Sequence, residues 1–312
     1  MFRNSILLLV LCMPGTAAST AQIPAPLKIN AGQSGFEGIL DNLDFFGASL
    51  ANLGDLDGDG VPELAVGATG DDDRGASSGA VWILSLTPEL LPERIVERHT
   101  KISPEDTTLT DDRTGDFFGA SLANLGDLDG DGVPELAVGA NGDDIGGANT
   151  GAVWILFLRA DGTVKDQQKI SATTGGFGGT LKERDLFGSA LANLGDLDGD
   201  GVPELAVGAT GDDDGEVEAG AVWILFLRAD GTVKDQQKIS NGIHITHDES
   251  DPLFDNDKLG SALANLGDLD GDGVPELAVG AIGDDAQRDS EAGRDTGAVW
   301  ILVLRADGTV KD

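Results

Sequence analysis

Apolar residues occur along this chain in short segments that glycine-rich and acidic segments separate. Two of these apolar segments recur four times in nearly the same form, as Glu-Leu-Ala-Val-Gly-Ala and Gly-Ala-Val-Trp-Ile-Leu. Runs that are rich in β-branched and aromatic residues and bounded by turn-forming residues are typical of β-strands. No segment has the apolar period of an amphipathic helix. The pattern therefore predicts an all-β protein.

Each repeat contains four predicted strands. In the first repeat they span residues 48–53, 63–67, 80–84 and 101–103, and Pro62 stands where a proline is tolerated, at a strand entrance. The later outer strands are predicted at residues 169–171 and 238–240. Asp-Gly pairs, a strong hairpin signal, join the last two strands at Asp161-Gly162, Asp230-Gly231 and Asp307-Gly308.

The repeat has a nearly constant period. Its first acidic-loop residue is Asp55, Asp127, Asp196 and Asp268, so successive repeats are 72, 69 and 72 residues apart. A fixed period of this size indicates stacked or ring-like architecture, and four antiparallel strands per unit form a propeller blade. We predict a β-propeller of four-stranded blades at about residues 31–103, 104–171, 172–240 and 241–312.

The two ends of the repeat region leave two arrangements open. The last repeat stops before its outer strand, whereas residues 27–30 (Leu-Lys-Ile-Asn) match that strand but precede the first blade. Residues 27–30 could complete the fourth blade and close a four-bladed ring, which removes the exposed edges. Alternatively, the four repeats are part of a larger array.

Residues 1–21 are predicted to be a signal peptide, followed by a mature chain of residues 22–312. Arg3 precedes an apolar run at 6–13 that is too short to span a bilayer, and small residues up to Ala21 form a cleavage site. Lipidation at Cys12 is an alternative that the preceding leucine disfavours. Because Cys12 is the only cysteine, the mature protein has no disulfide. We expect a secreted or cell-surface protein without a transmembrane segment.

The chain is strongly acidic, with 55 acidic and 20 basic residues and a formal net charge of −35. Nucleic acids and anionic membranes are therefore excluded as partners, since binding them requires lysine and arginine. The hydrophobic content of 40% argues against a disordered acidic chain. A folded protein with this charge is expected to bind cations.

The segment Asp-Leu-Asp-Gly-Asp-Gly-Val-Pro-Glu predicts a calcium site. Its carboxylates are those of Asp55, Asp57, Asp59 and Glu63, and Val61 is expected to contribute a backbone carbonyl. Oxygen ligands in this number suit Ca²⁺, and the carboxylates repel one another without a cation. The equivalent residues are Asp127, Asp129, Asp131, Val133 and Glu135; Asp196, Asp198, Asp200, Val202 and Glu204; and Asp268, Asp270, Asp272, Val274 and Glu276. About four Ca²⁺ ions are expected.

Two other interpretations of this loop are weaker. An EF-hand requires a glutamate at its twelfth position and flanking helices, but Val66 stands there within a predicted strand. A turn that binds no metal is disfavoured because all four repeats keep every ligand.

The repeats resemble FG-GAP repeats, the blades of the integrin α-subunit propeller and of related bacterial surface proteins. The similarity lies in Phe46-Gly47-Ala48 and its equivalents, each followed by the acidic loop and Val-Gly-Ala, and it covers residues 27–312. It implies Ca²⁺ binding in the hairpin between the first two strands. The chain departs from the family pattern at Glu63, where aspartate is usual, and at Leu259, where the aromatic residue is missing. It also has repeats for four blades, whereas integrin propellers have seven.

The loops on the side opposite the acidic loops differ between repeats. They are residues 71–78, 143–150, 212–219 and 284–296, together with 173–186 and 241–258. We expect any partner site there, because binding residues concentrate on loops held by a rigid scaffold; unconstrained drift would give the same variation. Acidic runs such as Asp71-Asp72-Asp73 are interpreted as a solvated rim.

The remaining candidates for chemistry are few. His244 and His247 could be drawn as a metal site, but they occur in one repeat and lack further histidine or cysteine ligands. Trp82 and its equivalents are interpreted as core residues between blades. No nucleophile motif or phosphate loop is present, so we predict a protein that is not an enzyme.

These observations predict a secreted calcium-binding propeller that acts as an adhesion or protein-interaction module. Its partner would be an extracellular protein or a surface glycan. The alternatives are a structural surface or matrix component without a specific ligand and, less favoured, a non-catalytic part of an extracellular hydrolase.

Overall fold

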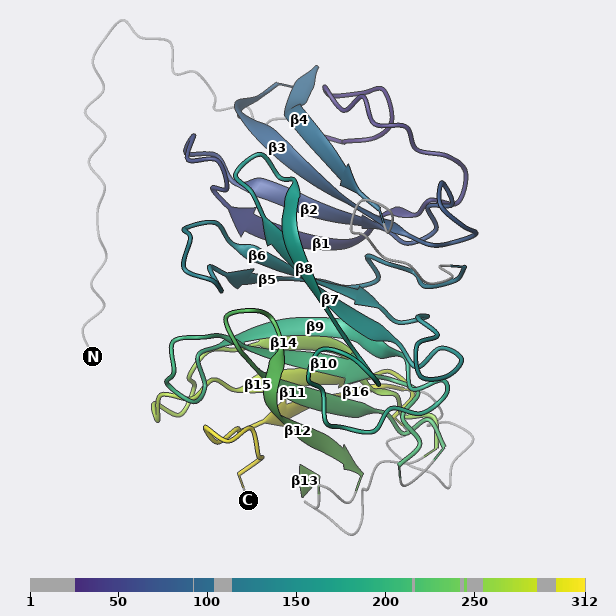
Figure 1. The fold of residues 1–312 in the computed structure, drawn as a ribbon, viewed down its shortest axis with the longest axis vertical. Helices are drawn as coiled ribbons and strands as arrows, with labels where there is room; N and C mark the ends of the chain where they lie inside the picture. The colour runs from purple at the N-terminus through teal and green to yellow at the C-terminus, as the bar shows by residue number, and fades with distance from the viewer. Residues whose placement is uncertain are drawn as a thin grey trace, which may run out of the picture.

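A computed structural model of the chain describes residues 26–91, 93–103, 114–214, 217–241, 244–245, 255–284 and 296–311. All regular elements of these residues are β-strands, and they form four antiparallel sheets, one per repeat, arranged as the blades of a β-propeller (Figure 1). The predicted fold class is confirmed.

The four sheets are built in chain order. The first blade contains β1 (Phe46–Gly54), β2 (Glu63–Ala68), β3 (Ala80–Leu91) and β4 (Arg94–Ile102). The second contains β5 (Leu122–Gly126), β6 (Glu135–Ala140), β7 (Ala152–Leu158) and β8 (Val164–Ser171). The third contains β9 (Phe187–Gly195), β10 (Glu204–Ala209), β11 (Ala221–Leu227), β12 (Val233–Asn241) and the short parallel β13 (His244–Ile245). The fourth contains β14 (Leu259–Asn265), β15 (Leu277–Ala281) and β16 (Ala298–Leu302).

The repeated sequences pair in the same register in every blade. Leu64 lies opposite Leu84, and the same leucine pair recurs in the three other blades. The predicted Asp-Gly turn forms between β7 and β8, where Gly162 adopts a left-handed φ of 77° that favours glycine. The outer strands β8 and β12 are longer than predicted, because the residues that follow each turn also join the ladder.

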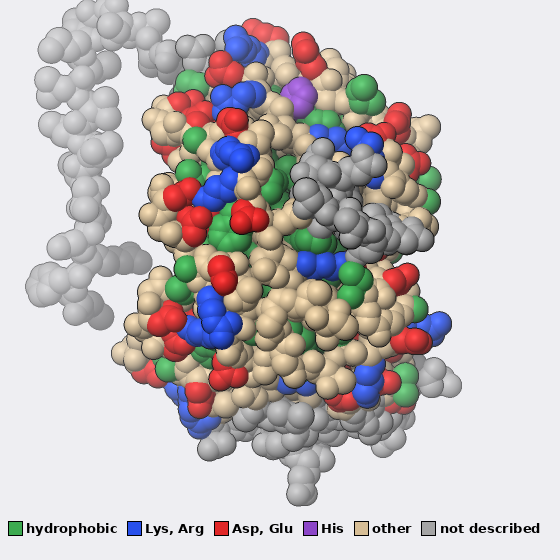
Figure 2. Space-filling model, in the orientation of Figure 1, with side chains coloured by type: hydrophobic (Ala, Val, Ile, Leu, Met, Phe, Trp, Pro, Cys, Tyr) green, Lys and Arg blue, Asp and Glu red, His purple; other side chains and the backbone are tan. Residues whose placement is uncertain are grey.

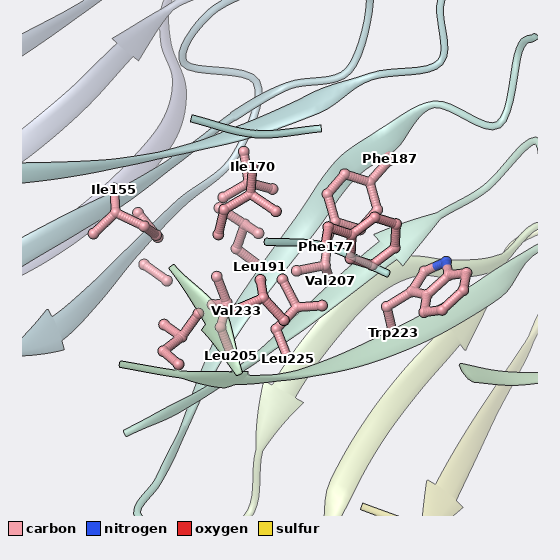
Figure 3. Close-up of a cluster of buried hydrophobic side chains, with 14 of the residues drawn as sticks. Ile155, Ile170, Phe177, Phe187, Leu191, Leu205, Val207, Trp223, Leu225 and Val233 are labelled. Atoms are coloured by element: carbon pink, nitrogen blue, oxygen red, sulfur yellow. The ribbon is translucent and has the colours of Figure 1, made fainter. Parts of the chain in front are cut away.

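Successive blades pack face to face along the chain. Contacts join β1 to β5, β5 and β6 to β9, and β9 and β10 to β14. The apolar core lies between neighbouring blades, and Figure 3 shows part of one such cluster, to which β7 contributes Ile155 and the third blade contributes Leu191, Val207 and Leu225. Burial between blades explains why the strands read as nearly continuous apolar runs: both faces of a middle sheet are covered.

Residues 27–30 do not complete the fourth blade in this structure. The fourth sheet contains β14, β15 and β16, and residues 26–30 lie outside any strand. Ile29 instead packs against the apolar cluster of the first blade. The local reason is Phe36, which stacks on Phe46 with ring centroids 5.2 Å apart and meets Trp82 edge-on, and so holds this segment beside β1.

The predicted signal peptide, residues 1–21, lies outside the described residues. Within the part of the chain that the structure describes, no helix is long and apolar enough to cross a membrane.

Candidate metal centres

The four acidic loops occupy the same place in the four blades. Each connects the first two strands of its sheet, between β1 and β2, β5 and β6, β9 and β10, and β14 and β15. The predicted ligands therefore all lie on one side of the array, at the tips of hairpins whose strands are held by the blade.

The first aspartate of each loop shapes the turn. The N–H of Gly58 donates to Oδ1 of Asp55 at 2.8 Å, and the N–H of Gly60 donates to its Oδ2 at 2.9 Å. Gly58 and Gly60 have φ values of 80° and 89°, a left-handed conformation that glycine adopts without steric cost. The same two hydrogen bonds recur in the other three loops.

The glutamate at the ninth loop position is buried, and only one of its two carboxylate oxygens accepts a hydrogen bond. Glu63 is 2% exposed, and its Oε2 accepts a hydrogen bond from the N–H of Leu56 at 2.6 Å. Its Oε1 is buried without a hydrogen-bond partner, and the same holds for Glu135, Glu204 and Glu276. Leaving a buried carboxylate oxygen unpaired is costly unless a positive charge lies beside it.

Burial has a consequence for protonation at this position. It raises the pKa of Glu135 and of Glu204 to about 7, with the nearby Asp129 and Asp198 carboxylates adding to the effect. Burial also raises the pKa of Glu63 above its ordinary value. The fold thus holds an acidic group where its charged form is disfavoured in the absence of a cation.

The carboxylates of each loop converge. Ligand oxygens within 4.8 Å of one another are provided by Asp55, Asp57 and Glu63; by Asp127, Asp129 and Glu135; by Asp196, Asp198 and Glu204; and by Asp268, Asp270 and Asp272. The fifth-position Asp59, Asp131 and Asp200 stand outside the first three groups, and Glu276 stands outside the fourth. The carboxylate of Asp59 instead accepts a hydrogen bond from the N–H of Val61.

A basic side chain lies over each loop, a contact that the sequence pattern does not predict. The ammonium of Lys165 is 2.9 Å from Asp129, pairs with Asp131 and is 3.8 Å from Oε1 of Glu135, too far for a hydrogen bond. Lys234 and Lys311 occupy the equivalent places, and Arg98 contacts Asp57 at 2.8 Å in the first blade. Figure 2 shows acidic and basic side chains interleaved on this view of the surface. The signal in the sequence was a Val-Lys-Asp segment after three of the hairpin turns.

The loop residues fit a hard divalent cation. The donors are carboxylate oxygens, which Ca²⁺ prefers, and each site includes a buried glutamate oxygen that no protein donor satisfies. A single ammonium compensates only part of the negative charge of four carboxylates. A divalent cation would supply the missing positive charge.

The opposite side of the array contains a second repeated charge arrangement. Asp71 is 2% exposed and pairs with Lys101 at 2.5 Å, and this ammonium lies 5.5 Å from the ring centre of Trp82. Lysine, aspartate and tryptophan recur together as Lys169, Asp143 and Trp154, and as Lys238, Asp212 and Trp223. The interpretation of these acidic runs as a solvated rim was wrong for their first residue, which forms a buried ion pair; Asp72 is exposed as predicted.

The structure describes the tryptophans and one of the three histidine side chains. Trp82, Trp154 and Trp223 are 4%, 4% and 5% exposed, which confirms them as core residues, whereas the equivalent Trp300 of the fourth blade is only partly buried. The imidazole of His99 packs 5.0 Å from the ring of Phe36. His247 and the side chain of His244 lie outside the described residues.

Comparison with known proteins identifies the repeat. A profile of the FG-GAP repeat matches residues 46–84, 118–156, 187–225 and 259–302, which together make up more than half of the chain. Each matched segment begins at or just before the first strand of a blade and ends at its third strand.

Several integrin α subunits are similar in sequence. Integrin alpha-PS2 of Drosophila melanogaster is 30% identical over 246 residues, 77% of this chain and 15% of the relative. Integrin alpha-5 of Xenopus laevis is 33% identical over 181 residues, 54% of the chain and 15% of the relative. Human integrin alpha-7 is 31% identical over 199 residues, 60% of the chain and 14% of the relative. The chain therefore spans about one seventh of the length of these relatives.

Proposed function

The chain belongs to the FG-GAP repeat family, and from this premise we propose that it is a secreted, calcium-stabilised propeller that binds an extracellular protein or a surface glycan. The observation that supports the metal most directly is the buried Oε1 of the ninth-position glutamate, which has no hydrogen-bond partner in any of the four blades.

The proposed metal is Ca²⁺, with about four ions per chain, one for each loop. In the first blade its ligands would be the carboxylates of Asp55, Asp57, Asp59 and Glu63 with the carbonyl of Val61. The corresponding residues of the other three blades are proposed in the same roles. Glutamate at the ninth position is long enough to accept the N–H of Leu56 with one oxygen and to leave the other for the metal.

The metal would act as a structural crosslink. Each loop joins two strands of one blade, and neutralising its carboxylates removes their mutual repulsion. Since the cation binds the folded loop and not the unfolded chain, its binding free energy adds to the stability of the fold.

The adhesion role is proposed from the family and from the loops. The relatives named above are integrins, and in this chain the loops opposite the metal side differ between blades while the metal loops are identical. Residues 71–78 and 143–150 are two such differing loops, each fixed at its base by a buried aspartate–lysine pair. A varied surface on a rigid scaffold suits recognition of a macromolecule.

Secretion is proposed from the predicted signal peptide at residues 1–21. We propose no catalytic role, because the acidic clusters suit cation binding and the sequence contains no nucleophile motif.

Binding of the mature chain to immobilised extracellular matrix proteins and to immobilised surface polysaccharides tests the proposal. We expect the chain to bind at least one of these surfaces in calcium, and this binding to be lost in chelator. Exchanging residues 71–78 for residues 143–150 should change that binding while leaving calcium-dependent thermal stability intact, which serves as the control for folding. Binding that is unchanged by both chelator and loop exchange, or the absence of binding to any of these surfaces, would refute the adhesion role.

A further inference from the structure

Each interface between blades is made by two different faces. The trailing face is the side of a blade that meets the next blade, and in the first blade it includes Leu53, Leu56, Val81 and Ile83. The leading face is the side that meets the preceding blade, and in the second blade it includes Phe118, Leu122, Leu136, Val138 and Trp154. The same pairing of trailing and leading faces forms the two following interfaces. Figure 3 shows part of the one between the second and third blades.

The trailing face of the fourth blade is exposed. Val81, Val153 and Val222 are each 0% exposed, whereas the equivalent Val299 is 70% exposed. Ile301 and Leu269 are likewise 51% and 64% exposed, although their equivalents in the first three blades are buried. This face thus presents the same apolar side chains that form the interior interfaces.

The leading face of the first blade is also exposed, in its inner part. Leu50 is 60% exposed, whereas the equivalent Leu122 and Leu191 are 9% and 8% exposed. Residues 29–40 cover the outer part of this face, where Phe36 packs on Phe46 and Trp82. The equivalent Phe177 packs on Phe187 and Trp223 in the third blade, which nevertheless accommodates the second blade. The covering segment is therefore compatible with a neighbouring blade.

A row of asparagine hydrogen bonds, the asparagine ladder, crosses the three interfaces, and at each one the later blade donates to the earlier blade. The amide Nδ2 of Asn124 donates to the carbonyl of Asn52 at 2.9 Å, Asn193 donates to Asn124, and Asn265 donates to Asn193, each at the same distance. Asn52 stands at one end of the ladder and Asn265 at the other. A further blade on the trailing side would meet the carbonyl of Asn265, and one on the leading side would meet the amide of Asn52.

We infer that the trailing face of the fourth blade binds the leading face of the first blade of a second copy of this chain. A second copy is the expected partner because the two end faces are complementary to each other. Their apolar residues and asparagines match those that pair at the three interior interfaces. The contact brings Val299 and Ile301 of one copy against Leu50 of the other. It also places the amide of Asn52 opposite the carbonyl of Asn265.

Head-to-tail contact between identical copies either closes a ring or continues indefinitely. Two copies contain eight blades, which lies within the range of about four to eight found in closed propellers. A dimer that closes in this way buries both exposed faces of both copies. We therefore expect a dimer as the associated state.

Sedimentation velocity over a range of micromolar concentrations tests this inference with single-face variants. The wild-type chain should sediment as a dimer. Leu50→Asp, which blocks the leading face, and Ile301→Asp, which blocks the trailing face, should each be monomeric with an unchanged circular dichroism spectrum. A mixture of the two variants should regain a one-to-one dimer, because each still has the face that the other needs.

Val217→Asp is the matched control, since Val217 is 60% exposed but lies outside both faces. It should remain dimeric. A monomeric wild-type chain would overturn the inference, as would self-association that persists in either blocked variant, a mixture that stays monomeric at the highest concentration, or loss of the dimer in the control.

Discussion

The second and fourth blades contain the same strand sequence, Ala-Val-Trp-Ile-Leu, in different surroundings. In β7 of the second blade Val153 and Ile155 are fully buried, whereas in β16 of the fourth blade Val299 and Ile301 are largely exposed. Both strands nevertheless pair in the same register with the preceding strand. Strand formation is thus local to the repeat, while burial depends on whether another blade follows.

The acidic loops between the first two strands of each blade show the opposite behaviour. In the fourth blade Glu276 is 1% exposed and its Oε2 accepts the N–H of Leu269, as the corresponding glutamate does in the second blade. Asp268 also receives the same two glycine N–H groups as Asp127. The hydrogen bonds that shape the loop are therefore made within its own hairpin, whereas the burial of the apolar faces depends on a neighbouring blade.

The largest expected difference is between Ile155→Ala and Ile301→Ala. Truncation of the buried Ile155 should lower the free energy of unfolding by about 2–5 kcal/mol, because it removes apolar contacts and leaves a cavity. Truncation of the exposed Ile301 should cost about 0.5 kcal/mol. Urea unfolding of both variants in the monomeric Leu50→Asp background measures the difference, and equal costs would show that the fourth blade is covered in solution.

A pH effect is expected at a buried carboxyl of the third blade. Burial raises the pKa of Asp185 from 3.8 to about 6. A group with a raised folded-state pKa does not destabilise the fold at low pH, but does so increasingly as pH rises from about 4 to about 6.

Asp185→Asn should therefore gain stability relative to wild type as pH rises through this window, by about 1–3 kcal/mol at neutral pH. Thermal unfolding at a series of pH values measures the gain. The exposed Asp72→Asn serves as the control, and a stability difference that does not vary with pH would contradict the assignment.

The asparagine ladder predicts a smaller difference. Asn193 and Asn52 both accept the N–H of a following glycine through Oδ1, but Asn193 also donates across an interface to Asn124. Asn193→Ala should therefore cost about 1 kcal/mol more than Asn52→Ala in the Leu50→Asp background. Equal losses in urea unfolding would mean that the bond between blades adds nothing to stability.

The smallest effect concerns the lysine over the metal loop. Lys165 pairs with Asp129 and Asp131, two proposed ligands, so its ammonium competes with a cation for their oxygens. Lys165→Met should raise the calcium affinity of that loop several-fold and lower the stability of the metal-free protein. Lys311→Met should act in the same way in the fourth blade. Calorimetric titration measures the affinity, and weaker calcium binding in either variant would show that the lysine assists the metal.

Much of the fold was predictable because the sequence repeats. Four copies of one strand pattern and the Asp-Gly turns predicted one sheet per repeat, and Pro62 marked the entrance to β2. The candidate ligands were proposed from spacing alone, since nine consecutive residues contain all four carboxylates; the structure brings three of the four together in each loop.

Other features depend on contacts between distant segments, which one sequence does not display. Lys165 and Lys101 reach their carboxylates from strands that lie 28 or more residues away in the chain. The exposure of Val299 could not be predicted either, because its local sequence is the same as that of the buried Val153. The place of residues 27–30 stayed open between two arrangements, because a pattern match to a strand does not include the packing of Phe36 beside them.

Calcium titration of the mature chain by calorimetry, with thermal unfolding followed in calcium and in chelator, tests the central claim most directly. The account predicts about four sites and a marked fall in unfolding temperature when the metal is removed, since binding to the folded loops stabilises the fold. No binding, or an unfolding temperature that is the same in calcium and in chelator, would contradict the claim that the acidic loops are calcium sites.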